Sequence, residues 1–420
     1  MTTTLGNGGD PLGPPRGFAA VRVCLLGFTV PDAALDEVVA VDRHMPSPTH
    51  NFAWSLVDAL GRAGLQVGLL SVWPVSNFPG NPRVVFRSAP FETKGVVGEC
   101  LGFVNLIGLK HVTRFLQCLT RGTRVLRRWR PTVLLVHGVH SPFLLYAAIS
   151  RGLLGLTVVV ILTDPPGVRL PTDRLTVRIL KWLDIKLVQL ALRWADAVIA
   201  LTTDLATDFA PGKPALVIDG IGQFDSDAEH VRKDRTQPTV VYAGSLRSSY
   251  GVDRLVDAVS GLTDPPATLE VYGNGELADW VSEVAAEQTQ IEGPRLLSRE
   301  DLLRAYRSAD LLVQPRPTNQ SFVRYSFPSK IIEYMASGTP VLTTRLVGVT
   351  DEYTPYVYWI HDDSPAGIRK ALRDVLQLPE AERLNKGRRA AEFIRATRSS
   401  EAQGKRILTF LCGLDQKAPK

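Results

Sequence analysis

The sequence has few cysteines, and none of them form a closely spaced pair. Cys24, Cys100, Cys118 and Cys412 are the four cysteines in 420 residues, and no CxxC spacing occurs. Structural zinc sites are typically built from such pairs and disulfide scaffolds from many cysteines, so four cysteines far apart in the sequence predict neither. A reducing compartment therefore fits this cysteine usage best.

A secretion signal and a long apolar run are also missing. The first residues, MTTTLGNGGDPLGPPRG, lack the basic start and apolar core of a signal peptide, so we expect residues 1–17 to be a disordered leader. The most apolar window, residues 153–163, is about half the length that spans a bilayer, which predicts a buried strand. We recognise no nucleic-acid-binding module, and no nucleic-acid partner is predicted.

The composition that remains is that of a folded protein with two domains. Hydrophobic residues make up 45% and charged residues 21% of the 420 residues, and this length exceeds what one hydrophobic core usually serves. The net charge of +6 suits an anionic partner, which could be a nucleotide, a nucleic acid or an acidic lipid. Charge alone does not choose among them.

Short apolar strands alternate with amphipathic helices along the chain. Residues 21–28 and 65–72 have the pattern of buried strands, and residues 51–64 between them have the pattern of a helix that ends at a glycine. Such βαβ units imply a parallel sheet that is covered on both faces. The same pattern continues, so we predict that residues 18–220 form an N-terminal Rossmann-like domain.

A second series of strands and helices follows a polar, charged stretch. Residues 225–238 lack hydrophobic periodicity and are predicted to be a linker. Residues 221–395 then have the spacing of another Rossmann-like, doubly wound domain. The helical pattern of residues 396–416 predicts a last helix that crosses back to the first domain. The fold class is thus α/β, with two such domains facing a central cleft.

One stretch combines an apolar helix with an acidic residue. In SFPSKIIEYMASGTPVLTTR, residues 326–345, we expect Pro328 in the first turn of a three-turn helix, with Ser326 or Ser329 capping backbone donors. Glu333 is either an ordinary solvated residue or faces a cleft that holds hydrogen-bond donors. The vicinal hydroxyls of a ribose are suitable donors, and a diphosphate would suit the start of the helix.

The order of four motifs in the second half resembles a known family. These motifs are VVYAGSLRSSYGVDRLVDAV, LEVYGNGEL, REDLLRAYRSADLLVQPRPT and FPSKIIEYMASGTPVLTT. Together they are similar to the donor domain of glycosyltransferase family 4 (glycosyl transferases group 1), particularly to bacterial members that build capsular or exopolysaccharide. The resemblance implies the GT-B fold and retaining sugar transfer from a nucleoside diphosphate, of UDP or GDP type, without a metal ion.

The resemblance also implies where the donor binds. The family motif is a pair of glutamates separated by seven residues; Glu333 matches the second, which binds ribose, and Tyr325 stands at the first. Ser245 and Tyr250 stand where the family often has an Arg and a Lys. The positive charge that balances the diphosphate must therefore come from other residues. We expect Arg247 and Lys330 to act in catalysis, with Arg316 and Arg324 as further donor-site cations.

Backbone groups and small residues complete the predicted donor site. Leaving-group charge develops on the diphosphate in the transition state, so preorganised donors there supply most of the catalysis. The glycines of YGNGE could bring the chain close to the nucleotide, or could simply form a turn. The remaining donor-site candidates are Gly244, Ser245, Gly273, Gly275, Ser326, Phe327, Pro328 and Ser329.

Polar residues follow two predicted strands of the first domain. His137 and His140 end one strand and Asp164 follows the next, so these side chains are expected at the carboxyl edge of the sheet, facing the cleft. The resemblance implies that a polar residue at the position of Asp164 approaches the sugar or acceptor, and Asp164 and His140 are our catalytic candidates there. His50 and Asn51 match a loop and helix start in the family; helix capping is the alternative for Asn51.

A basic segment suggests a further partner. Residues 109–131 interleave seven cations with apolar residues at helical spacing, which predicts either a helix on an anionic membrane or an outer helix with a solvated face. The cations are Lys110, Arg114, Arg121, Arg124, Arg127, Arg128 and Arg130. We expect a cytoplasmic protein, or one that is peripheral on the inner face of the membrane.

These inferences predict a glycosyltransferase that acts on a lipid-linked or glycan acceptor in cell-surface polysaccharide or glycoconjugate synthesis. Two alternatives stay open. A sugar-nucleotide epimerase on the same fold would need no acceptor. A non-catalytic nucleotide-sugar-binding partner would account for the departures at Tyr325, Ser245 and Tyr250.

Overall fold

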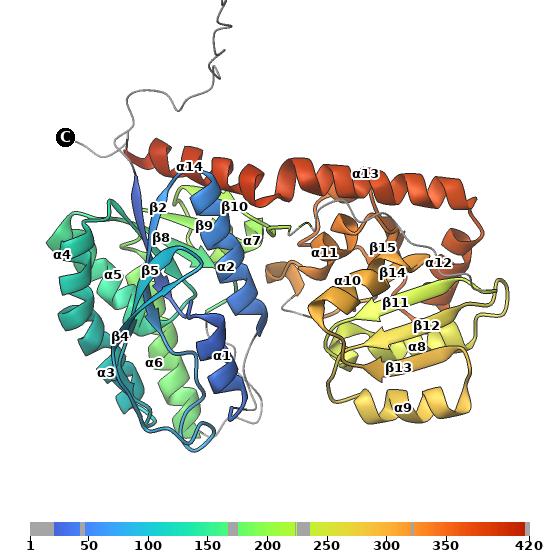
Figure 1. Ribbon diagram of the computed structural model, residues 1–420, viewed down its shortest axis with the longest axis horizontal. Coiled ribbons are helices and arrows are strands. Elements are labelled where there is room, and N and C mark those ends of the chain that lie inside the picture. The colour runs from blue at the N-terminus through green and yellow to red at the C-terminus, as the bar shows by residue number, and fades with distance from the viewer. Residues whose placement is uncertain are drawn as a thin grey trace, which may run out of the picture.

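The computed structural model describes residues 21–42, 47–166, 175–222, 224, 236–320 and 323–415. The predicted leader and residues 225–235 of the predicted linker lie outside this part of the chain. Two parallel sheets stand side by side beneath a pair of long C-terminal helices (Figure 1).

The first sheet has eight strands in the order β10-β9-β8-β7-β1-β2-β5-β4, and only the β4–β5 pair is antiparallel. Its central strands are buried on both faces, as continuous apolar runs require. The strand bounds are β1 Arg22–Gly27, β2 Gln66–Val72, β4 Ala89–Thr93, β5 Val96–Leu101, β7 Val133–His137, β8 Thr157–Leu162, β9 Ala197–Ala200 and β10 Ala215–Val217; β3 (Val85–Phe86) and β6 (Phe103–Val104) form a separate small ribbon.

Helices cover both faces of this sheet and build two apolar cores. On one face lies α2 (Ser47–Arg62), preceded by α1 (Asp32–Val39). On the other face lie α3 (Leu109–Gln117), α4 (Thr123–Trp129), α5 (Ser141–Leu154), α6 (Leu175–Leu192) and α7 (Thr203–Phe209), with a π-helical turn between α3 and α4. This is the doubly wound arrangement that the sequence predicts.

The second sheet has six parallel strands in the order β13-β12-β11-β14-β15-β16. They are β11 Thr239–Ala243, β12 Thr268–Tyr272, β13 Ile291–Arg295, β14 Leu311–Gln314, β15 Val341–Thr344 and β16 Tyr358–Ile360. The covering helices are α8 (Val252–Ser260), α9 (Ala278–Glu287), α10 (Arg299–Arg307), α11 (Lys330–Ala336) and α12 (Pro365–Leu376). Two further cores, one on each face, confirm a second doubly wound unit.

The last two helices join the two units. Helix α13 (Glu380–Arg398) packs on α11, and α14 (Ser400–Asp415) packs on α2. Ile407 and Leu411 are buried in the same core as α2, which confirms the predicted return of the C-terminal helix (Figure 1). The domain boundaries drawn from the sequence stay a prediction.

A buried arginine marks the junction between α13 and α14. Arg398, at the end of α13, is 8% exposed and forms ion pairs with Asp219 (2.9 Å) and Glu352 (2.7 Å). Tyr353 donates to the same Asp219 carboxylate at 2.5 Å. Burial alone would lower the pKa of Arg398, but the two carboxylates outweigh it, and the pKa is raised. The segment that leaves the first sheet is thereby tied to both the helix junction and the second domain.

Candidate functional site

Two loops lie side by side at the carboxyl edge of the second sheet. The Gly244 N–H donates to the Tyr272 carbonyl at 2.9 Å, and the Leu246 N–H donates to the Asn274 carbonyl at 3.0 Å. Gly273 has a φ of +138°, and a Cβ there would lie 1.8 Å from the Gly244 oxygen. The glycines of YGNGE are therefore required by the contact between the two loops, and their approach to a nucleotide stays a prediction.

Two buried tyrosines position the first of these loops. Tyr242 donates its hydroxyl hydrogen to the Ser245 carbonyl at 2.9 Å. Tyr334 of α11 accepts from the Ala243 N–H at 2.8 Å and lies 3.1 Å from the Ala243 carbonyl. Burial raises the pKa of both phenols, so they stay neutral. They fix α11 beside residues 243–245, where Gly244 and Ser245 are partly exposed.

Helix α11 differs from its prediction at its start. It begins at Lys330 and is seven residues long, about two turns rather than three. Pro328 precedes the helix, and its carbonyl accepts the Ile331 N–H at 2.9 Å. Neither predicted cap forms: Ser329 makes no side-chain cap bond, and the Ser326 hydroxyl accepts from Arg316 at 3.0 Å instead.

Glu333 is paired on the helix surface and is not a buried charge. Its Oε2 accepts from Lys330 Nζ at 2.7 Å, and both side chains are partly exposed. Lys330 Nζ also lies 3.3 Å from the hydroxyl of Tyr306, a tyrosine of α10. The acidic residue in an apolar helix is thus explained locally: one side of α11 is core, and the other carries this lysine–glutamate pair.

The other predicted cations of this edge have different surroundings. Arg247 is exposed and precedes the short 3₁₀ turn at Ser248–Tyr250. Arg316 is buried, with its guanidinium carbon 4.9 Å from the ring centroid of Tyr250, and burial lowers its pKa. Phe327 is also buried, 5.6 Å from the ring of Tyr353. Of these predicted residues, Arg247 is exposed and Lys330 is half-exposed, so both can reach a ligand. Arg316 is buried, and Phe327 belongs to the core.

Arg324 and Tyr325 reach across to the first domain. Arg324 forms ion pairs with Asp204 at 3.0 Å and Asp208 at 2.9 Å, both on α7. Tyr325 donates to Asp208 at 2.8 Å, and this bond is the main cause of its raised pKa. Its ring also lies 5.2 Å from Phe209. The position that carries a glutamate in the family here holds the two domains together, and any donor contact of Arg324 stays a prediction.

His140 lies in a basic and aromatic cluster at the carboxyl edge of the first sheet. Its Nε2 accepts from Arg114 at 3.3 Å, and its ring packs against Phe28, His111 and Phe143. Burial, followed by the charge of Arg114, holds its pKa well below the usual value. His140 is therefore a neutral imidazole with its proton on Nδ1. Such a ring can donate one hydrogen bond from that nitrogen.

Asp164 and the α2 start complete this edge. Asp164 is exposed just after β8 and accepts from Thr163 at 3.0 Å. His50 is buried and bonds Asp32 at 3.0 Å. Because α2 begins at Ser47, Asn51 lies in its second turn, and the capping alternative for Asn51 is wrong.

His137 is a structural residue of the first core. It ends β7, is buried, and packs with its ring 5.7 Å from that of Phe52. Its Nε2 has no hydrogen-bond partner among the described residues. Burial lowers the pKa of His137 to about 4. The ring is therefore neutral at physiological pH and cannot be protonated without opposing the fold.

His137→Leu should make the protein less sensitive to acid. An unfolded histidine has a pKa of about 6.5, so the unfolded chain binds the extra proton as the pH falls from there toward 4, and the wild type loses on the order of 3 kcal/mol of stability. We expect the variant to lose less free energy of unfolding than the wild type between pH 7 and pH 4, as measured by urea denaturation. His361→Leu, at an exposed histidine, is the control. Equal acid losses in His137→Leu and the wild type would contradict the assignment.

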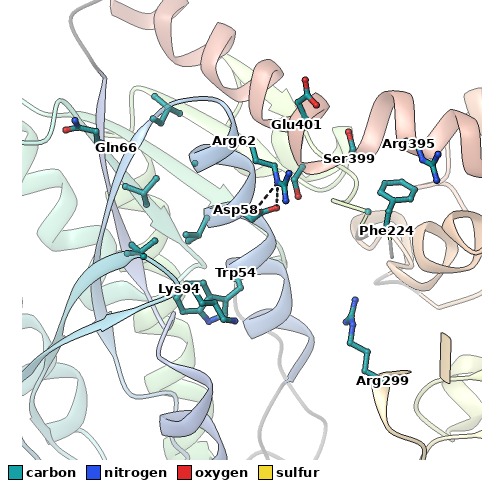
Figure 2. Close-up of a pocket in the computed structure, with 18 of the residues that line it drawn as sticks. Trp54, Asp58, Arg62, Gln66, Lys94, Phe224, Arg299, Arg395, Ser399 and Glu401 are labelled. Carbon is teal, nitrogen blue, oxygen red and sulfur yellow. Dashed lines mark hydrogen bonds and ion pairs between the residues drawn. The ribbon is translucent and has the colours of Figure 1, made fainter. Parts of the chain in front are cut away.

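A large cavity lies between the domains, on the α2 side of the first sheet. Its volume is about 1250 Å³, and its walls come from α2, the β4–β5 turn, the start of α10 and the α13–α14 junction. Figure 2 shows Arg62 held by Asp58, with Arg299 and Arg395 on the opposite wall. None of the predicted site residues lines it. On the first sheet it touches the residues where β2 and β5 begin, so the cavity is not the candidate site at the carboxyl edges.

The basic segment 109–131 folds differently from its prediction. Lys110 and Arg114 are 4% and 3% exposed; Lys110 donates to the Val75 carbonyl at 2.6 Å, and Arg114 to the Trp73 carbonyl at 2.9 Å. Burial lowers the pKa of Lys110 to about 7 and that of Arg114 to about 9. These two cations point into the protein, so they cannot contact lipid headgroups, whereas Arg124 and Arg127 on α4 are exposed.

Several residues of the site escaped the sequence analysis. Tyr306 and Tyr334 contact Lys330 and the β11 loop, and Asp208 engages Tyr325. Tyr334 lies within residues 326–345, directly after Glu333, and this position could have identified it as a site residue. Nothing near Asp208 in the sequence points to a partner 117 residues away.

No group of three or more His, Cys, Asp or Glu side chains within the described residues could hold a metal ion. No helix in the same part of the chain has the length and apolar character needed to cross a bilayer.

Comparison with known sequences identifies both halves. Residues 223–396 match the model of glycosyl transferases group 1, and residues 49–213 match that of a glycosyl transferase 4-like domain. A GDP-mannose-dependent alpha-(1-6)-phosphatidylinositol dimannoside mannosyltransferase of Mycobacterium tuberculosis is 28% identical over 185 residues, which cover 42% of this chain and 47% of that protein. A glycogen synthase of the same organism is 28% identical over 158 residues, 36% of this chain and 37% of that one. The chain thus spans about half or less of the curated relatives it matches.

Solved structures share the whole fold. A sucrose-phosphate synthase of Thermosynechococcus elongatus superposes with a TM-score of 0.66 at 15% identity and covers 95% of this chain and all of its own. HepE of Anabaena, solved in complex with UDP, superposes with a TM-score of 0.61 at 15% identity, over 94% of this chain and all of its own. These likenesses confirm the predicted two-domain GT-B fold. With both halves matched by their family models, the chain belongs to the glycosyl transferases group 1, glycosyltransferase family 4.

Proposed function

We propose that this protein is a retaining glycosyltransferase. It moves a sugar from a nucleoside-diphosphate donor to a hydroxyl of a lipid-linked or glycan acceptor in cell-surface polysaccharide or glycoconjugate synthesis. The observation that carries the proposal is the Lys330–Glu333 pair on α11. It lies where the family's donor-binding motif places its ribose-binding glutamate, and α11 is tied to the loop at Gly244 and Ser245 by Tyr334.

The pair suits both ends of a nucleoside diphosphate. Lys330 engages Oε2 of Glu333, and Oε1 of the same carboxylate can accept from the vicinal hydroxyls of a ribose. The ammonium of Lys330 and the exposed guanidinium of Arg247 can neutralise the charge that develops on the leaving diphosphate. The backbone N–H of the partly exposed Ser245 is a further candidate donor for it, whereas the Gly244 N–H is already bonded to the Tyr272 carbonyl.

No cofactor beyond the donor co-substrate is part of the proposal. In this proposal, protein cations would take the role that a metal ion has in other phosphate chemistry. A uridine or guanosine diphosphate donor is favoured, because one relative is named as GDP-mannose-dependent and one structural neighbour was solved with UDP. On the acceptor side, His140 and Asp164 at the carboxyl edge of the first sheet are the candidate contacts. We place the protein in the cytoplasm or on the inner face of the membrane.

Donor binding can be tested without knowing the sugar or the acceptor. A ligand that binds only the folded state stabilises it by about 2.7 kcal/mol at 100 times its Kd. We expect uridine or guanosine diphosphate to raise the melting temperature and adenosine diphosphate to raise it less. Glu333→Ala should abolish this shift, while Glu287→Ala, at an exposed glutamate of α9, should keep it. Equal shifts in parent and Glu333→Ala would contradict the ribose assignment.

Turnover separates transfer from the alternatives. A transferase releases nucleoside diphosphate in proportion to glycosylated acceptor, measured with a panel of nucleotide sugars and lipid-linked or glycan acceptors. Epimerisation of a nucleotide sugar without any acceptor would overturn the transferase in favour of the epimerase. Diphosphate binding with no turnover in the panel would favour a non-catalytic binding partner.

A further inference from the structure

The outer face of one helix layer of the first domain is apolar. Helices α3, α5 and α6 cover the same side of the sheet, and α5 packs against both of the others. Their large exposed apolar side chains, named here the apolar face, are Leu109, Val112 and Leu116 of α3, Ile149 and Leu153 of α5, and Ile179, Trp182, Leu183, Leu187 and Leu190 of α6. Exposed apolar side chains gathered on neighbouring helices are typical of an interaction site.

Helix α6 has apolar residues on both its inward and its outward side. Its inward side is buried in the core at Val188, Ala191 and Leu192. Its outward side repeats apolar residues every three or four positions, from Ile179 through Leu183, Leu187 and Leu190. An outward side that is also apolar is typical of a helix that packs against something beyond its own domain. Trp194, just beyond the helix, is 55% exposed and continues the outward stripe.

Helix α3 repeats this arrangement with its cations turned inward. Lys110 and Arg114 are buried, whereas Leu109, Val112 and Leu116 are exposed. The loop that leads into the helix projects Ile107, which is 70% exposed. The burial of two cations and the exposure of the apolar residues of the same helix reverse the usual order for a solvated surface helix.

The charge around the apolar face is mainly positive. Residues 100–163 contain no Asp or Glu, although they carry eight Lys or Arg residues. On α6, the exposed cations Arg178 and Lys186, followed by Arg193, lie next to apolar-face residues in the sequence. Helix α4, which follows α3, adds the exposed cations Arg124, Arg127 and Arg128. The carboxylate of Asp184 on α6 is partly buried and acts on the neighbouring His111 of α3. An anionic partner with an apolar interior matches both properties.

We propose that the apolar face docks the protein on an anionic lipid bilayer. Apolar residues of α3, α5 and α6 would enter the boundary between headgroups and acyl chains, Trp182 and Trp194 would sit at the headgroup level, and the flanking cations would contact anionic headgroups. A second copy of this chain is the less favourable occupant, because it would bring two basic surfaces together.

Docking through this face would also position the candidate acceptor-binding residues relative to the membrane. Asp164 follows β8 and His140 precedes α5, so both lie at the sheet edge from which α5 starts. Docking through α3, α5 and α6 would hold this edge near the membrane, where a lipid-linked hydroxyl would be presented. This last step rests on the proposed function. The docking surface does not, since it stands on exposure and charge alone.

Vesicle binding of the full chain tests the proposal. We expect the protein to co-sediment with vesicles of phosphatidylcholine and phosphatidylglycerol and to bind vesicles of pure phosphatidylcholine much more weakly. Rising salt concentration should release the protein from the anionic vesicles. The double substitution Leu183→Glu with Leu187→Glu should lower the partition coefficient about tenfold or more, because it places charge on the outward stripe. Val39→Glu, at an exposed apolar residue of α1 beside α2 (Figure 1), is the matched control and should bind as the parent does.

Further readouts separate docking from folding, self-association and donor binding. The double variant should keep its circular dichroism and its stabilisation by nucleoside diphosphate. Absence of parent binding to anionic vesicles, or equal binding by the double variant, would overturn the proposal. So would a parent dimer that the double substitution dissociates without any vesicle binding, which would assign the face to a second copy. Vesicle binding together with failure of every donor would leave the docking surface standing and remove only the proposed function.

Discussion

Arg398→Met should lower the free energy of unfolding by about 3–5 kcal/mol. Arg398 is 8% exposed, and its loss leaves the Asp219 carboxylate, which is 11% exposed, without its cation. Removing one member of a buried ion pair has this effect because the remaining charge stays desolvated and unpaired. Tyr353, which donates to Asp219 and packs against Phe327 and Phe393, would also lose the hydrogen bond that Arg398 donates to its hydroxyl at 3.3 Å. Urea denaturation followed by circular dichroism and by tryptophan fluorescence measures the loss.

Matched variants show whether the ion pairs cause this loss. Arg395→Met removes an exposed arginine one turn earlier on α13 and should change the stability by less than about 0.5 kcal/mol. Asp219→Asn together with Arg398→Met should be less destabilising than the sum of the two single changes, because the partners are coupled. A loss below about 1 kcal/mol for Arg398→Met alone would show that the junction is held by helix packing instead.

Lys330→Ala should lower kcat by about 10²- to 10³-fold with a smaller change in KM. The size is that of removing one preorganised donor from developing negative charge. The ammonium is held by Glu333 and Tyr306 before any ligand arrives, so its stabilisation of the leaving diphosphate needs little reorganisation. Steady-state release of nucleoside diphosphate with the best donor and acceptor pair is the measurement.

A lysine in a similar local setting provides the control. Lys370 pairs with Asp374 at 2.5 Å on the surface of α12, so Lys370→Ala removes a helix ion pair without touching the candidate site, and its kcat should stay within about twofold of the parent. Lys330→Arg keeps the charge and should retain more activity than Lys330→Ala. If Lys330→Ala and Lys370→Ala had the same kcat, the catalytic assignment of Lys330 would fail.

The sequence predicted those parts of the fold that depend on local patterns. Apolar runs such as that of β1 and periodic helices such as α8 recur in the expected order. The pattern of the last segment predicted a helix, and the expected return of that helix to the first domain is confirmed by the core it shares with α2. Residues near Glu333 were also placed correctly at a sheet edge, since a helix between two strands of a parallel sheet begins there. The starts of α2 and α11 differ from their predicted positions, because local capping preferences compete with tertiary packing at helix ends.

The parts that could not be predicted depend on partners distant in the sequence. Tyr325 bonds Asp208, and Arg316 lies over Tyr250; neither pair has a local signal. The sequence predicts α3 as a basic amphipathic helix, yet carbonyls that follow β2 accept hydrogen bonds from its Lys110 and Arg114, whose side chains therefore point inward. A periodic pattern gives the two sides of a helix, but only the fold decides which side is buried.

The return of α14 to the first sheet has a consequence for how the protein is made. Residues such as Leu25 and Leu69 share a core with Ile407 and Leu411. During synthesis at about 5–20 residues per second, this core of the first domain stays incomplete until α14, near the end of the chain, has been synthesised. The nascent N-terminal domain therefore leaves the ribosome with an uncovered apolar flank, and it becomes a complete domain only when the second one has already been made.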